Sequence, residues 1–349
     1  MLVNLVNNMD HTKFDITVMA LFGGGVNERF LSEKVRLVVC HKKPIPGNSH
    51  LMKLFTPKQL YHNYVKEHYD IIVSYLEGPS ARIVSGCDDS HTKLVSWVHC
   101  TMHAPTELAQ GFRSVNEATA CYNRMDTIAY VAGAVRDAFL ESCSYKGRNI
   151  VLYNTNESEK ILQKAAETVT LPEEGFHWCG VGKITENKGF DRMIRIQKRL
   201  IGEGYKIHLC ILGEGAQKVE LEKLVADCGI TDSVTFLGYQ TNPYKYVAKC
   251  DLFVCASHSE GFSTAATEAL IVGTPVCTVE VSGMKEMLGE HNEWGIVTEN
   301  DEEALYQGIK RLLDDPALLA HYKEKAVQRG KTFSTENTVK AVEDMLLSL

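Results

Sequence analysis

The sequence predicts an α/β protein with two doubly wound units, and three observations lead to this prediction. Short apolar runs alternate with segments of helical spacing, which is typical of parallel sheets covered by helices. The alternation stops in a loop near residue 170 and then starts again. The length of 349 residues also suits two domains. We therefore expect one domain at 1–170 and a second at 171–333.

The first half opens with a helix and continues with strands and helices in turn. Apolar residues at positions 2, 5, 6 and 9 have the spacing of one helix face, and no strand precedes them, so the sequence begins inside a helix. Strands are predicted at 14–21, 35–39, 70–74, 93–99, 127–131 and 149–153. Helices are predicted at 57–67, 114–125 and 134–141.

The second half repeats this arrangement after a connecting helix at 157–168. Strands are predicted at 176–181, 206–212, 234–237, 252–255, 276–278 and 295–297. Helices are predicted at 190–201, 217–228, 243–249 and 301–313, with others beginning near Ser263, Pro316 and Ser334. A crevice between two units of this kind is a usual place for a ligand.

Composition limits the classes of function. A nucleic-acid-binding protein would be basic, whereas the net charge here is −7, so we expect no nucleic-acid partner. No apolar run reaches the roughly 18 residues of a membrane span, and the N-terminus lacks the layout of a signal peptide. The 11 cysteines are scattered and never form Cys-x-x-Cys, which fits a reducing compartment. We therefore expect a cytoplasmic protein.

One stretch of the second half, residues 257–276, carries most of the candidate chemistry. It follows an apolar strand, and it places Glu260 in a loop and Glu268 a turn into the next helix. Ser263 and Thr264 are both good N-cap residues for that helix. A helix N-terminus at the carboxyl end of a parallel strand offers free N–H groups to an anion such as phosphate.

The residues around this helix start extend the argument to sugars. Gly261 would let the backbone approach a ligand closely. Glu260 and Glu268 could accept hydrogen bonds from sugar hydroxyls beside the anion. A phosphate flanked by sugars describes a nucleotide-sugar. An ordinary strand-to-helix connection with two solvated glutamates is the alternative, and these residues alone do not decide between the two.

Three further features are candidates with ordinary structural alternatives. Lys183 and Lys188 follow the first strand of the second half and could converge on an anion, at about 1.5–3 kcal/mol for each charge-assisted hydrogen bond, or could be solvated surface lysines. Gly213 ends the next strand in a Gly-x-Gly turn, which by itself is common. His99 ends a strand of the first half, where a lone histidine is more often structural.

The spacing Glu260-x7-Glu268, followed by Ala-Leu and by Gly-Thr-Pro-Val at 273–276, resembles the signature of the retaining GT-B glycosyltransferases of family 4. The resemblance is dense from about 178 to 297 and thinner in the first half. It implies the GT-B fold, in which two Rossmann-like domains face a central cleft. It also implies that the final helix, at about 334–349, packs back on the first domain.

The resemblance implies a role for each candidate residue. The catalytic residues would be Glu260, which holds the donor sugar, His99, which faces that sugar, and Lys188. Lys183, where the family usually has arginine, would grip the donor diphosphate together with Lys188. Glu268 would bind the ribose. The other implied donor-binding residues are Gly261, Phe262, Ser263, Thr264, Gly213, Gly238 and Tyr239.

The implied reaction moves a sugar from a nucleoside-diphosphate sugar, UDP- or GDP-linked, to an acceptor hydroxyl with retention of anomeric configuration. This would serve the synthesis of a cell-surface polysaccharide or glycoconjugate. We expect no cofactor and no metal, since the sequence has no Asp-x-Asp pair to hold a divalent ion on the diphosphate. A lipid-linked glycan acceptor would bring the protein into peripheral contact with the inner membrane face.

One departure from the family leaves two alternatives open. Family members begin with a strand and a glycine-rich loop before their first helix, and this sequence has neither ahead of its first helix. We therefore also consider an internal start or a truncated, non-catalytic remnant that binds a nucleotide-sugar. A GT-B sugar-nucleotide epimerase is a further alternative, which would release free nucleoside diphosphate without an acceptor.

Overall fold

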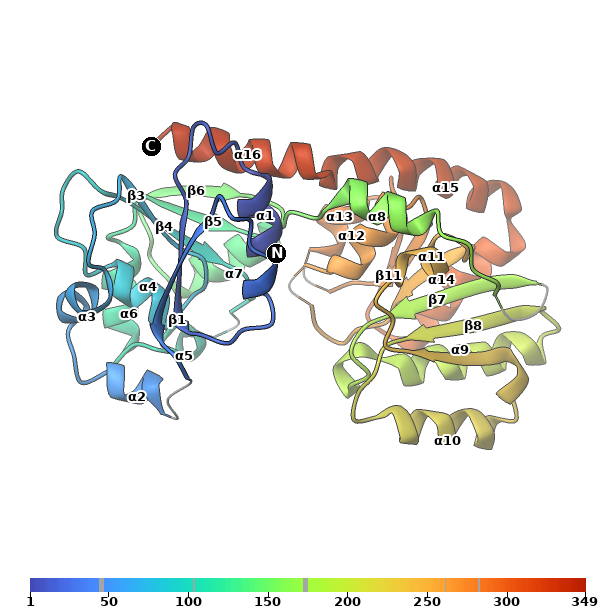
Figure 1. The fold of residues 1–349 in the computed structure, drawn as a ribbon. Coiled ribbons are helices and arrows are strands. Elements are labelled where there is room, and N and C mark those ends of the chain that lie inside the picture. Colours follow the sequence, from blue (N-terminus) through green and yellow to red (C-terminus); the bar gives the residue numbers. More distant parts are fainter. Residues whose placement is uncertain (44–46, 103, 172–174, 261, 282) are drawn as a thin grey trace. The chain divides into compact units, whose positions relative to one another are not determined.

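The described residues form two compact units (Figure 1). The structure is a computed structural model, which describes residues 1–43, 47–102, 104–171, 175–260, 262–281 and 283–349. Unit 1 consists of Met1–Asn156 together with Thr335–Leu349, and unit 2 is Glu157–Ser334. The connecting helix expected at 157–168 thus groups with the second unit, and the last helix groups with the first.

The strands of unit 1 are parallel and lie in two separate sheets. One sheet pairs β1 with β2, and the other has the order β3-β4-β5-β6. The strands are β1 (Thr17–Phe22), β2 (Arg36–His41), β3 (Ile71–Ser74), β4 (Lys93–Val98), β5 (Thr127–Tyr130) and β6 (Arg148–Val151). β5 is fully buried, whereas all of β1 is half-buried. Among the described residues, β1 and β3 each have a strand neighbour on one side only.

Helices surround these sheets, and the last helix of the chain returns to unit 1. The helices are α1 (Leu2–Asn8), α2 (Asn48–Met52), α3 (Pro57–Tyr64), α4 (Pro79–Val84), α5 (Pro105–Leu108), α6 (Val115–Tyr122), α7 (Gly133–Ser142) and α16 (Thr335–Leu347), with a 3-10 turn, η1 (Glu28–Phe30). α16 packs on α1, and Glu343 on it accepts a hydrogen bond from the Asp10 backbone N–H at 2.6 Å.

Unit 2 is built on one parallel sheet with the order β12-β11-β10-β7-β8-β9. The strands are β7 (Phe176–Val181), β8 (Ile207–Leu212), β9 (Val234–Gly238), β10 (Leu252–Cys255), β11 (Val276–Val279) and β12 (Ile296–Thr298). β8, β10 and β11 are buried along their whole length, as expected for a sheet covered on both faces. The strand order reverses between β7 and β10, so the carboxyl ends of these two strands form the topological switch point.

Helices cover both faces of this sheet (Figure 1). α9 packs with α10 and α14, and α12 packs with α8, α11 and α15. The helices are α8 (Ser158–Ala165), α9 (Phe190–Gly202), α10 (Lys218–Cys228), α11 (Tyr244–Val247), α12 (Thr264–Ile271), α13 (Met284–Leu288), α14 (Glu302–Asp314) and α15 (Pro316–Gly330), with 3-10 turns η2 (Glu186–Lys188), η3 (Thr231–Ser233) and η4 (Lys331–Phe333). Over the described part of the chain, no helix has the length and apolar character to cross a bilayer.

Candidate functional site

The candidate site lies at the switch point of unit 2. β7 ends at Val181 and β10 ends at Cys255, and the two strands are neighbours in the sheet. The loop after β7 carries Lys188, and the loop after β10 carries Glu260. Ligands of open α/β sheets bind at this position because the loops diverge there and leave a crevice.

Hydrogen bonds and a glycine hold these two loops together. Asn187 donates from Nδ2 to the Ser259 carbonyl at 2.9 Å, and the His258 N–H donates to the Asn187 carbonyl at 2.8 Å. Gly189 has φ +62°, and a Cβ on it would lie 2.1 Å from the Ala256 carbonyl oxygen. The loops can therefore approach this closely only with glycine at position 189.

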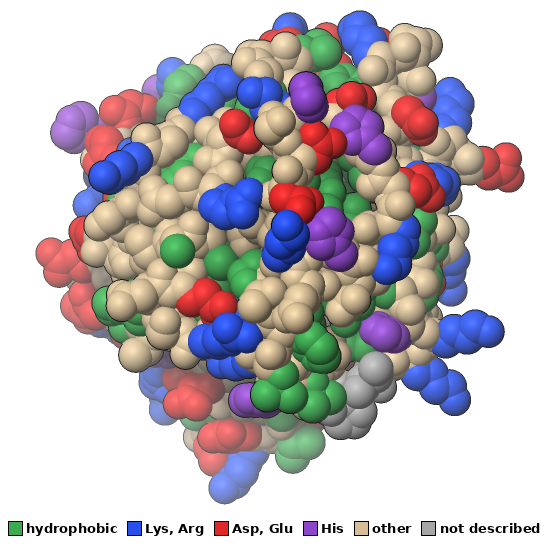
Figure 2. Space-filling view, turned by 90° about the vertical axis from the view of Figure 1, so that its left-hand side faces the viewer, with side chains coloured by type: hydrophobic (Ala, Val, Ile, Leu, Met, Phe, Trp, Pro, Cys, Tyr) green, Lys and Arg blue, Asp and Glu red, His purple; other side chains and the backbone are tan. Residues whose placement is uncertain are grey.

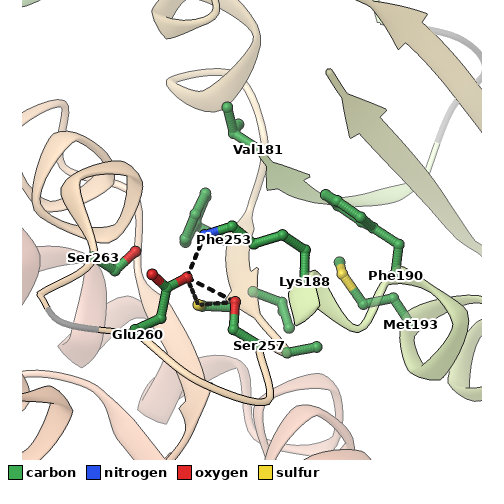
Figure 3. A pocket seen from close by; sticks show the side chains of 11 residues that line it. Val181, Lys188, Phe190, Met193, Phe253, Ser257, Glu260 and Ser263 are labelled. Carbon is green, nitrogen blue, oxygen red and sulfur yellow. Dashed lines mark hydrogen bonds and ion pairs between the residues drawn. The ribbon is translucent and has the colours of Figure 1, made fainter. Parts of the chain in front are cut away.

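The two loops bring a lysine and a glutamate together in a small pocket (Figure 3). Lys188 Nζ lies 2.5 Å from Glu260 Oε1, and Ser257 Oγ donates to the same oxygen at 2.7 Å. The side chains of Lys188 and Glu260 are 27% and 13% exposed, so solvent screens this ion pair less than a surface pair. The pocket is lined by Val181, Lys188, Phe190, Met193, Phe253, Val254, Cys255, Ala256, Ser257, Glu260 and Ser263.

The N-terminus of α12 opens beside this pocket. Ser263 is its N-cap and accepts a hydrogen bond from the Ala266 N–H at 3.3 Å, as its residue type predicts. Thr264 is the first helical residue. Phe262 is buried, with its ring 5.9 Å from that of Phe333. Gly261 lies outside the described residues.

Glu268, the second carboxylate of the motif, faces a tyrosine that no sequence motif marks. Tyr244 on α11 donates from its hydroxyl to Glu268 Oε1 at 3.1 Å. Burial raises the pKa of Glu268 to about 7, against the lowering effect of this hydrogen bond. Burial also raises the pKa of Tyr244, so the tyrosine is the donor across the physiological range.

The glycine turns after β8 and β9 line the same edge of the sheet as the β7 loop. The Gly213 N–H donates to the Gly238 carbonyl at 2.9 Å, and a Cβ on Gly213 would lie 1.8 Å from the Gly182 carbonyl oxygen. Tyr239 is 75% exposed, and Lys183 is also exposed. These side chains are therefore open to a ligand, but no contact within the described part of the protein fixes them beside Lys188 and Glu260.

His99 belongs to unit 1, whereas the other candidate residues belong to unit 2. The Glu77 carboxylate accepts hydrogen bonds from the backbone N–H groups of His99 and Cys100, at 3.4 and 3.0 Å. The imidazole packs on Tyr75 at a centroid distance of 4.8 Å, and its buried Nε2 has no partner among the described residues. Burial lowers the pKa of His99, so the ring is neutral at neutral pH.

The structure thus gathers Lys188, Glu260 and Ser263 in one pocket and adds two residues to the candidates. Ser257 could have been suspected from its place three residues before Glu260 in the same loop. Tyr244 had no signal in the sequence, because its contact with the glutamate depends on how α11 and α12 pack. Among the described residues, no group of three or more histidine, cysteine, aspartate or glutamate side chains could hold a metal ion.

Comparison with known proteins matches this region to one family. The profile of the family described as "Glycosyl transferases group 1" matches residues 163–329. An N-acetylgalactosamine-N,N'-diacetylbacillosaminyl-diphospho-undecaprenol 4-alpha-N-acetylgalactosaminyltransferase of Campylobacter jejuni is 38% identical over 198 residues, which are 56% of this chain and 52% of that protein. The lipopolysaccharide core biosynthesis glycosyltransferase LpsD of Rhizobium meliloti is 29% identical over 200 residues, or 57% and 56%. The chain thus spans about half the length of these relatives.

Solved structures agree with the architecture along the whole chain. HepE of Anabaena in complex with UDP superposes with a TM-score of 0.77 at 17% identity, covering 100% of this chain and 95% of that one. The sucrose-phosphate synthase of Thermosynechococcus elongatus gives a TM-score of 0.77 at 17% identity, covering 99% and 91%. The fold is therefore the expected GT-B fold. Residues 163–329, which include the candidate site, are similar to the glycosyl transferases group 1.

Proposed function

We propose that the protein is a retaining glycosyltransferase that takes its sugar from a nucleoside-diphosphate sugar. The observation that carries the proposal is the meeting of Lys188, Glu260 and the α12 N-terminus at the switch point of unit 2. A cation, a carboxylate and free helix N–H groups in one pocket suit a diphosphate bonded to a sugar. HepE, which has the same fold, is described in complex with UDP and with UDP-glucose.

Each group has a definite task in this proposal. The Lys188 ammonium and the N–H groups at the start of α12 stabilise the negative charge that the diphosphate gains as it departs. When the donor binds, Glu260 exchanges its ion pair with Lys188 for hydroxyls of the donor sugar, and Ser257 keeps the carboxylate in place. Glu268 accepts hydrogen bonds from the ribose, with Tyr244 fixing its orientation. The protein supplies position and electrostatics, without a protein nucleophile or a metal.

The proposal is less specific about the acceptor than about the donor. The first relative is named for transfer to a diphospho-undecaprenol-linked sugar and the second for lipopolysaccharide core synthesis. We infer that this protein also acts in the synthesis of a cell-surface glycan, with a hydroxyl of a lipid-linked or free glycan as acceptor. His99, which is neutral and keeps Nε2 without a partner among the described residues, is the candidate in unit 1 for a hydrogen bond to a sugar.

A donor screen followed by product analysis tests the proposal. UDP- and GDP-linked sugars would be ranked by the rise in melting temperature that each produces, because a ligand that binds the folded state stabilises it. The best donor would then be incubated with glycan-lipid extracts, and the anomeric configuration of the product read by NMR. We expect one donor class to stabilise the protein and the product to keep the donor's configuration.

Two results would change the conclusion. An inverted product would refute the retaining mechanism while leaving the donor site intact. Donor binding with no transfer to any extract, and no release of nucleoside diphosphate, would indicate a nucleotide-sugar-binding protein without catalytic activity.

A further inference from the structure

A basic segment stands out in unit 1 of this acidic protein. The net charge of the chain is −7, yet residues 34–66 contain no aspartate or glutamate. Their basic residues are Lys34, Arg36, Lys42, Lys43, Lys53, Lys58 and Lys66. Lys42 and Lys43 are exposed and Lys53 is half-buried, and none of the three forms an ion pair within the described part of the chain. The segment therefore presents positive charge that the described residues do not neutralise.

Large apolar side chains are exposed in the same segment. Leu51 is 51% exposed, Leu54 75% and Phe55 42%, all on α2 or in the turn that follows it. Figure 2, which looks onto the face of unit 1 that bears α2, shows hydrophobic side chains gathered at its lower edge. Large apolar side chains that are exposed next to one another mark a surface that binds a membrane or another protein.

The backbone beneath these side chains is held from inside the protein. Arg82 is fully buried and donates to the carbonyls of Met52 and Phe55, each at 2.7 Å. Arg113 donates to the carbonyls of Lys53 and Phe55 at 2.6 and 2.9 Å. Because four hydrogen bonds anchor the peptide units of this turn, its backbone cannot turn these residues inward without breaking them. The fold therefore maintains their exposure.

We propose that α2, the turn at 53–55 and the exposed Lys42 and Lys43 form a docking surface for an anionic lipid bilayer. Leu51, Leu54 and Phe55 enter the boundary between headgroups and acyl chains, and Lys42, Lys43 and Lys53 contact lipid phosphates. Interfacial anchors combine these same two elements, apolar side chains and uncompensated lysines. The carboxylates that reach this segment, Glu67 and Asp88, are paired with Arg36 and Lys58, so the remaining lysines favour a uniformly negative surface over a protein partner with charges of both signs.

Vesicle co-sedimentation tests this proposal without any donor or acceptor, so its outcome is separate from that of the proposed function. The full chain would be mixed with vesicles of phosphatidylcholine containing 30% phosphatidylglycerol and with vesicles of phosphatidylcholine alone. We expect binding to the anionic vesicles that falls in 0.5 M salt, since salt screens lysine–phosphate attraction. Replacing both Lys42 and Lys43 by glutamine should weaken binding by about fivefold for each lysine.

Matched variants separate docking from misfolding. The variant Leu54→Ser removes the most exposed apolar residue of the surface and should weaken vesicle binding at least fivefold, with an unchanged melting temperature. Val219→Ser removes a residue of unit 2 that is 77% exposed, and it should bind as the wild type does. Equal binding by Leu54→Ser and Val219→Ser, or no binding of the wild type to anionic vesicles, would overturn the proposal.

Discussion

The buried carboxyl of Glu268 makes donor binding depend on pH in a predictable direction. Burial raises its pKa to about 7, so at pH 6 roughly one molecule in ten carries the carboxylate, and at pH 8 nearly all do. A ribose hydroxyl donates to a carboxylate more strongly than to a neutral carboxyl. We therefore expect affinity for a nucleotide-sugar to be weaker at pH 6 than at pH 8, by up to about tenfold, the limit in which only the carboxylate form binds.

Calorimetric titration with the preferred nucleotide-sugar measures this change directly. Its diphosphate is esterified on both sides and has no ionisation in this range, so the ligand does not contribute to the profile. Glu268→Gln should bind weakly at both pH values and lose the dependence, whereas Glu222→Gln, an exposed glutamate of α10, should keep it. Tyr244→Phe removes a hydrogen bond that lowers the pKa of Glu268, so the midpoint should move to higher pH.

The same carboxyl predicts how stability changes with pH. Its pKa is higher in the folded protein, about 7, than the ordinary 4.5 of the unfolded chain. The contribution of Glu268 to the free energy of unfolding is therefore fully present below pH 4.5. It falls by about 3 kcal/mol as the pH rises through about 7. A wild-type affinity that is flat from pH 6 to pH 8, with the same stability difference between wild type and Glu268→Gln at both pH values, would refute this reasoning.

Two substitutions test residues that stabilise the site loops and the interior of unit 1. Gly189→Ala should lower both the free energy of unfolding and donor affinity, because it combines a positive φ with a backbone clash. The control Gly229→Ala has a similar φ but open space around it, so it should lower the free energy of unfolding by about 1 kcal/mol and leave donor affinity unchanged. Denaturant unfolding and calorimetry measure the two quantities. Arg82→Met should lower the free energy of unfolding by about 3–5 kcal/mol, because it leaves Glu117 without its fully buried partner. Arg113 is more exposed and also pairs with Glu117, so an equal or larger loss in Arg113→Met would contradict this reasoning.

Much of unit 2 could be predicted because its signals are local. The apolar runs of β7, β8 and β10 and the N-cap at Ser263 are each visible within a few residues of sequence. The loops that carry Lys188 and Glu260 are also recognisable, since both follow strands. That they meet depends on the strand order, in which β10 lies next to β7 although more than 70 residues separate Lys188 from Glu260. The family resemblance, rather than any local pattern, assigned both residues to one donor site, and their ion pair was not predicted.

Other features depend on contacts that no local pattern records. The short helix α2 has little apolar periodicity, and its turn is fixed by Arg82, 30 residues from Met52. Tyr244 reaches Glu268 only because α11 packs on α12. The division of the unit 1 strands into two sheets likewise follows from strand pairing and not from strand propensity, which β1 and β3 both satisfy.

The affinity of a lysine variant for the nucleotide-sugar tests the central claim most directly. In the proposed mechanism, Lys188 leaves Glu260 and binds the donor diphosphate, a charge-assisted contact that contributes about 1.5–3 kcal/mol. Calorimetry should therefore show Lys188→Ala binding the donor at least tenfold more weakly than the wild type, and Lys198→Ala, an exposed lysine of α9, binding it equally well. Equal affinity of Lys188→Ala and the wild type would contradict a donor site at the switch point of unit 2.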